Sequence, residues 1–126
     1  MSITGTIRRS DRGPLGTAED VKRHLADAFP GVELTFAASE PPAVAEARTS
    51  LQAALGLPCD LLSAGRRYPH HFGHWESGTG AIVQLYFDAE EPVRSIEAIS
   101  YGMTGGLDAN FGRLCAATGW TVLFEP

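Results

Sequence analysis

Residues 68–101 read YPHHFGHWESGTGAIVQLYFDAEEPVRSIEAISY, and this part of the chain predicts three consecutive β-strands. Residues 81–87 are almost all β-branched, aliphatic or aromatic, which is typical of a central strand. The turn residues 77–80 precede them and the acidic turn 88–92 follows them. Connections this short join antiparallel neighbours, because parallel neighbours need long crossovers. The chain is therefore predicted to build a mostly antiparallel sheet.

The segments on either side of these strands alternate between helix and strand patterns. Apolar residues three and four apart predict helices, and strict alternation predicts strands. Prolines or small polar residues precede two of the predicted helices, and glycines follow them. The predicted order is β-α-β-α-β-β-β-α-β, over residues 3–7, 18–29, 32–36, 41–55, 68–76, 81–87, 93–101, 107–118 and 120–124. We therefore predict a single α+β domain over residues 1–126, with a sheet of about five or six strands and about three helices packed on one face.

Composition limits the classes of function that are open to this chain. It has 126 residues, 44% of them hydrophobic, which is enough for one ordinary globular core. With 10 basic and 15 acidic residues the net charge is −5, which disfavours binding to nucleic acid or to an anionic membrane. The N-terminal residues lack the apolar region of a signal peptide, and no apolar run is long enough to span a bilayer. We expect a cytoplasmic protein that exists as a monomer or a small homo-oligomer.

Residues 69–76, Pro-His-His-Phe-Gly-His-Trp-Glu, contain three of the four histidines and a carboxylate. This composition admits a metal site or a general acid–base centre. On a strand, however, His70 and His74 would lie about 13 Å apart, which is too far for one ion. The strand would place His70, Phe72, His74 and Glu76 on one face and His71, Gly73 and Trp75 on the other. A histidine-rich strand that faces a partner or is half-buried is therefore the preferred interpretation, with no metal and no cofactor.

Three further groups near this segment are candidates for binding. Two arginines in the preceding loop have the chemistry to grip a carboxylate or phosphate, and the acidic turn after residue 87 has the charge to meet a basic partner. A glycine-rich link before the third helix can present backbone N–H groups to an anion, although a sharp turn explains it more simply. The candidate residues for partner binding are Arg66, Arg67, His70, His71, His74, Glu76, Glu90 and Glu91, and those for anion binding are Gly105 and Gly106.

Several common catalytic patterns are missing from the chain. Cys59 and Cys115 lie far apart and belong to no C-x-x-C pair, so we interpret them as reduced thiols with apolar packing roles. Ser77 does not sit in a G-x-S-x-G elbow, because Trp75 occupies the place of the first glycine. No H-E-x-x-H motif, P-loop or aromatic RNA-binding motif is present. No residue is therefore assigned a catalytic role.

The last third of the chain resembles small bacterial proteins, some of which are regarded as immunity proteins of polymorphic toxin systems. The residues that carry the resemblance form an alternating strand at 93–99, a glycine-rich break at 101–106, and a Gly-Trp pair at 119–120 that opens the last strand. The resemblance implies a non-catalytic protein that neutralises a toxin. The acidic charge of the chain favours a basic partner, such as a basic toxin or nuclease. The resemblance carries over no catalytic residue.

Three hypotheses for function therefore stand side by side. The preferred one is a non-catalytic protein-binding module, possessing an acidic surface that steers it toward a basic partner. The alternative is a small-ligand protein or metal-dependent enzyme centred on the His70-His71-His74 segment. The third is a subunit that pairs through the apolar edge of its final strand.

Overall fold

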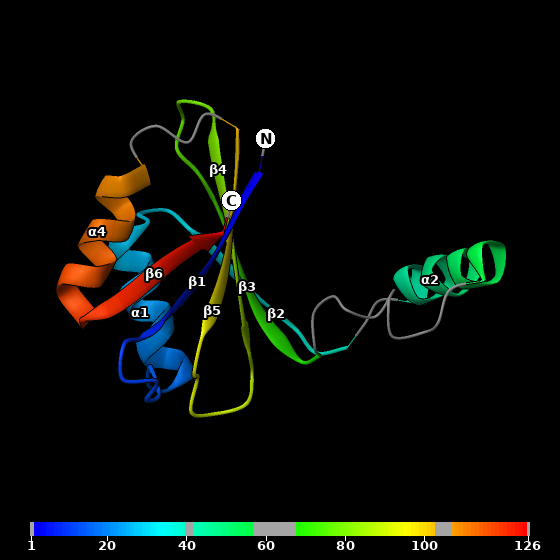
Figure 1. The fold of residues 1–126 in the computed structure, drawn as a ribbon, viewed down its shortest axis with the longest axis horizontal. Helices are drawn as coiled ribbons and strands as arrows, with labels where there is room; N and C mark the ends of the chain where they lie inside the picture. The colour runs from blue at the N-terminus through cyan, green and yellow to red at the C-terminus, as the bar shows by residue number, and fades with distance from the viewer. Residues whose placement is uncertain (1, 40–41, 57–67, 103–106, 126) are drawn as a thin grey trace.

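The computed structural model describes residues 2–39, 42–56, 68–102 and 107–125 of the chain. These residues form six strands and the helices that accompany them (Figure 1). The elements are β1 (Ser2–Arg9), α1 (Ala18–Ala28), β2 (Glu33–Ala37), α2 (Pro42–Leu55), β3 (His70–Glu76), β4 (Ala81–Asp88), β5 (Ile96–Gly102), α4 (Leu107–Thr118) and β6 (Trp120–Glu125). The predicted α+β fold with a mostly antiparallel sheet is confirmed.

All six strands belong to one antiparallel sheet in the order β2-β3-β4-β5-β1-β6. Because neighbours alternate in direction, β1 runs parallel to β2 and β5 runs parallel to β6. Strands that point the same way need a crossover, and α1 and α4 supply it for these two pairs. Both helices lie on the same side of the sheet, where they contact each other (Figure 1).

The hydrophobic core lies between the sheet and these two helices. Strand β4 contributes Val83 and Leu85, and α1 contributes Val21 and Leu25, all of them fully buried. Phe29, at the end of α1, is also fully buried and meets Trp75 and Phe111 edge to face at ring centroid distances of 5.3 and 5.2 Å. Trp120 is buried in this core, and Trp75 is partly buried and packs against it.

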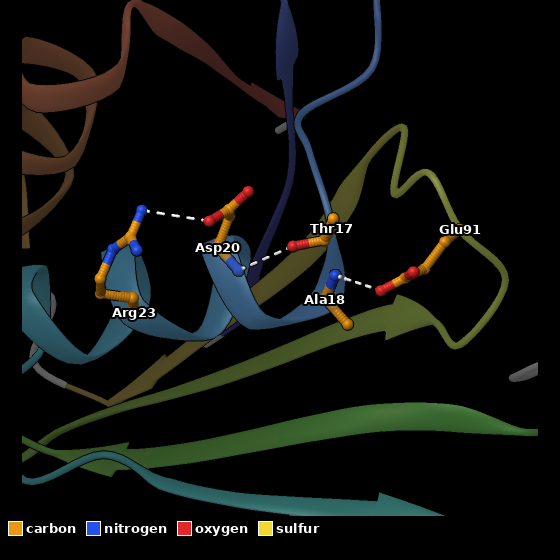
Figure 2. A network of polar contacts seen from close by, with 5 residues as sticks. All are labelled: Thr17, Ala18, Asp20, Arg23 and Glu91. Carbon is orange, nitrogen blue, oxygen red and sulfur yellow. Dashed lines mark hydrogen bonds and ion pairs between the residues drawn. The ribbon is translucent and has the colours of Figure 1, made fainter.

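Two side chains cap the beginning of α1 (Figure 2). The Thr17 hydroxyl accepts a hydrogen bond from the Asp20 N–H at 3.2 Å, as predicted for an N-cap residue. The Ala18 N–H donates to Glu91 Oε1 at 2.8 Å, although Glu91 lies 73 positions away in the turn after β4. The turn between β4 and β5 therefore supplies a second cap for α1.

Helix α2 differs from the expectation that all helices pack on one face. It stands apart from the sheet (Figure 1), and its described side chains are mostly exposed, with Leu55 60% exposed. The reason lies in the topology. Ala37 at the end of β2 pairs directly with His70 at the start of β3, so the intervening chain leaves and re-enters the sheet at one point. The helix-covered face is already filled by α1 and α4.

No helix within the described ranges combines the length and the apolar character needed to cross a membrane.

Candidate functional site

The side of the sheet opposite α1 and α4 carries outward-pointing side chains from all six strands. Alternate residues of each strand point to this side, and the pairing registers align them in rows. One row runs across the sheet as Thr35, Phe72, Tyr86, Glu97, Thr6 and Leu123, and the row beside it as Glu33, His74, Gln84, Ile99, Thr4 and Glu125. We call this side the open face, because neither of the core helices covers it (Figure 1).

Aromatic and histidine rings gather on the open face along β3 and β4. We call this group the ring strip, and it consists of Tyr68, His70, Phe72, His74 and Tyr86. Adjacent ring centroids lie 4.7 Å apart for Tyr68 and His70, and 4.9 Å apart for Phe72 and Tyr86. His70 is only 6% exposed even though its side of the sheet faces outward. The ring strip is therefore a packed surface that exists before any partner binds.

The predicted division of the histidines between two faces is confirmed. His71 points toward the helices, where its ring stacks on Phe87 at a centroid distance of 4.9 Å and is 8% exposed. His70 and His74 point the other way, and the His74 Nε2 atom lies 3.2 Å from Glu76 Oε1. The segment therefore does not bring its three histidines to one site.

Burial lowers the pKa of His71 below its ordinary value of 6.5. The positive charge of Lys22 lowers the pKa further, and His70 acts in the same direction. Glu19 and Glu91 act in the opposite direction because they favour the charged ring. The His71 Nδ1 atom is buried and has no hydrogen-bond partner among the described residues. These features describe a neutral histidine that packs in the core.

The metal-dependent alternative would need several ligand side chains gathered in one place among the described residues. Within them, no group of three or more histidine, cysteine, aspartate or glutamate side chains is arranged to hold an ion. Cys115 is a free, half-buried thiol, and burial raises its pKa, which disfavours the reactive thiolate. Cys59 lies outside the described residues.

The acidic turn after β4 lies at the same end of the sheet as the ring strip. His70 pairs with Asp88, and the Ala89 N–H donates to the Pro69 carbonyl at 3.3 Å. A hollow of about 350 Å³ lies there, lined by Tyr68, Pro69, Asp88, Ala89 and Glu90. A second hollow of about 290 Å³ shares Asp88 and Glu90 with it and extends along the turn to Ser95. The structure thus places the acidic turn beside the histidine segment, two groups that the sequence analysis treated separately.

The two predicted glutamates of this turn differ in their surroundings. Glu91 caps α1, so it has a structural contact in addition to any role in binding. Glu90 lines both hollows and is exposed. Four other predicted candidates, Arg66, Arg67, Gly105 and Gly106, lie outside the described residues.

Sequence reasoning missed the aromatic residues that complete the ring strip. Residues 81–87 predicted a central strand, and β4 does lie inside the sheet, but Ile82, Gln84 and Tyr86 are half-buried on the open face. The polar Gln84 between Val83 and Leu85 was the available signal for an outward-facing side. Tyr68 entered the prediction only as the first residue of the strand 68–76, and its ring contact with His70 places it in the ring strip.

Comparison of the chain with models of protein families and with curated proteins finds no match.

Proposed function

We propose that this protein is a non-catalytic protein-binding module that acts by covering a partner with its open face, in the manner of a cytoplasmic immunity protein. The ring strip carries this proposal. Antiparallel sheets often leave one face in water, but such a face is usually polar. Here it presents four clustered rings on two neighbouring strands and a fifth, Tyr68, just before β3.

A cluster of aromatic side chains is suited to an interface. Aromatic residues are enriched in protein interfaces, and they bury a large area with few rotatable bonds. The rings of the strip already pack on one another, so binding would cost little additional ordering of side chains. The resemblance of residues 93–124 to immunity proteins supplies the class of function and a toxin as the class of partner.

The proposal is tested by affinity capture from the lysate of the native host at low and high salt. Wild-type protein should retain one stoichiometric partner that is itself toxic, and Phe72→Ala should lose it. Leu55→Ala is the control, because Leu55 is likewise an apolar residue but is exposed on α2, outside the open face.

Affinity for the isolated partner gives the quantitative test. Truncation of a true anchor should cost about 2 kcal/mol or more of binding free energy. Capture of the same partner by Phe72→Ala and by wild type with equal affinity would contradict the assignment of the open face.

A further inference from the structure

We propose that a hollow beside the start of α4 binds a small uncharged molecule made of one apolar ring and one hydroxyl group. The hollow lies on the side of the sheet that α1 and α4 cover, so it is separate from the open face and does not depend on the proposed function. It has a volume of about 180 Å³. Residues of β1, β5, β6 and α4 line it, namely Ile3, Ser100, Phe124, Leu107, Asp108 and Phe111.

The buried hydroxyl of Ser100 is the observation that points to a ligand. Ser100 is 2% exposed, and its Oγ atom has no hydrogen-bond partner among the described residues. Its neighbours across the sheet are Ile3 on β1 and Val83 on β4, whose apolar side chains point to the same side. A buried hydroxyl without a partner lowers the stability of the fold. A ligand hydroxyl in the hollow would supply the missing partner.

The walls of the hollow are mostly apolar, and two of them are aromatic rings. Phe111 and Phe124 meet edge to face at a ring centroid distance of 5.2 Å. The ring of Phe124 lies over Gly5 on β1, where an added Cβ would approach it to 2.7 Å. The absent side chain of Gly5 thus gives this ring its place in the wall. A bound water needs two to four polar partners, whereas an apolar ring matches these walls.

The size and the charge of the hollow narrow the class of ligand. A cavity of about 150 Å³ with aliphatic and aromatic walls accepts one benzene ring. The hollow beside α4, at about 180 Å³, has room for one ring and a small polar group. Asp108 is exposed in the first turn of α4 and adds a negative charge, which disfavours carboxylates and phosphates. An uncharged alcohol or phenol therefore fits better than an organic acid or a plain hydrocarbon.

The test is an NMR titration of the full-length protein with benzyl alcohol, toluene and benzoate, which share one ring and differ in the attached group. Benzyl alcohol should bind with a Kd on the order of 1 mM. It should shift the signals of Ser100, Phe111 and Phe124. Toluene should bind about two- to tenfold more weakly, because it lacks the hydroxyl. Benzoate should also bind more weakly than benzyl alcohol, because Asp108 repels it.

Three results of this titration would overturn the proposal. They are the absence of benzyl alcohol binding, an affinity for toluene or benzoate that equals or exceeds that for benzyl alcohol, and signal shifts confined to residues outside the hollow.

The variant Ser100→Ala isolates the contribution of the hydroxyl. The preference for benzyl alcohol over toluene should disappear in it. Its melting temperature should equal or exceed that of wild type, because the substitution removes a buried hydroxyl that has no partner. A lower melting temperature would show that the fold itself satisfies this hydroxyl, which would contradict the proposal.

The variant Phe124→Ala removes an aromatic wall and should weaken the binding of benzyl alcohol about two- to tenfold. Leu123→Ala is the matched control, because Leu123 is the adjacent exposed residue of β6 and its side chain points to the open face. It should leave the affinity for benzyl alcohol unchanged, and an equal loss in both variants would contradict the assignment. If Phe124→Ala fails to fold, the comparison of the three probes on the wild-type protein still decides.

Discussion

At the scale of single residues, the burial of His71 in the core should make folding stability depend on pH. Its depressed pKa means that the folded protein resists protonation of this ring, whereas the unfolded chain accepts a proton near pH 6.5. Below that pH the unfolded state therefore binds more protons than the folded state. Folding stability should fall as the pH decreases from about 7 through this window, and the fall should end below the folded-state pKa.

The measurement is urea unfolding of wild type and variants at a series of pH values. His71→Phe should flatten the dependence in this window, because it removes the titrating group. Lys22→Met should weaken the dependence, because it removes a positive charge that lowers the pKa of His71. An unchanged pH profile in both variants would show that another group controls it.

Gly102 is a residue whose backbone admits no side chain. Its φ of +76° lies in the left-handed region, and an added Cβ would collide with the carbonyl oxygen of Gly80. Gly102→Ala should therefore lower the free energy of unfolding by at least about 1–2 kcal/mol.

The control is Gly112→Ala in α4, where an added Cβ meets no atom outside its own helix. That variant should gain about 0.5–1 kcal/mol, because alanine is the better helix former. The melting temperature should thus fall in Gly102→Ala and rise in Gly112→Ala. Shifts of both melting temperatures in the same direction would contradict this account.

At the scale of elements, the beginning of α1 depends on a turn that is distant in sequence. Glu91 accepts from the Ala18 N–H at 2.8 Å, next to the local cap made by Thr17 (Figure 2). Glu91→Ala should cost about 1 kcal/mol of stability, which is the typical value of an N-cap.

Glu90→Ala is the matched control in the same turn, and it should change stability by less than about 0.5 kcal/mol. Both are compared by chemical denaturation. If Glu90→Ala proves as destabilising as Glu91→Ala, the effect belongs to the turn and not to the cap. A binding defect of Glu91→Ala should be interpreted only after its stability is known.

At the scale of the whole molecule, helix α2 stands apart from the sheet and from α1 and α4 (Figure 1). The pairing of Ala37 with His70 brings the two ends of the segment that holds α2 to neighbouring positions. Replacement of residues 38–67 by a short turn should leave the fold intact. It should add stability of at most about 2 kcal/mol, because closing a shorter loop costs less entropy.

Circular dichroism and tryptophan fluorescence should report one coincident unfolding transition in this shortened protein, as expected of a single domain. Loss of cooperative unfolding would show that the segment contributes to the core. The shortened protein also shows whether partner binding needs residues 38–67 or only the ring strip, because it retains Tyr68 and the rest of that strip.

The candidate site could be predicted from sequence only in part. Alternation along a strand has a period of two, so the separation of His71 from His70 and His74 follows from local geometry. The sequence contains no comparable signal that His70 lies beside Asp88, because pairing between strands depends on the register of the whole sheet. The joining of the acidic turn to the ring strip could therefore not be predicted.

The sequence by itself determined the helices, the strands and the α+β class. These depend on residue periodicity and on short turns, which act within a few positions of the chain. Only the tertiary structure decided that α2 lies apart and that one face of the sheet stays open with five rings upon it. The reason is that burial depends on how the layers pack together. Helices α1 and α4 cover one face of the sheet, and no local sequence pattern indicates which face that will be.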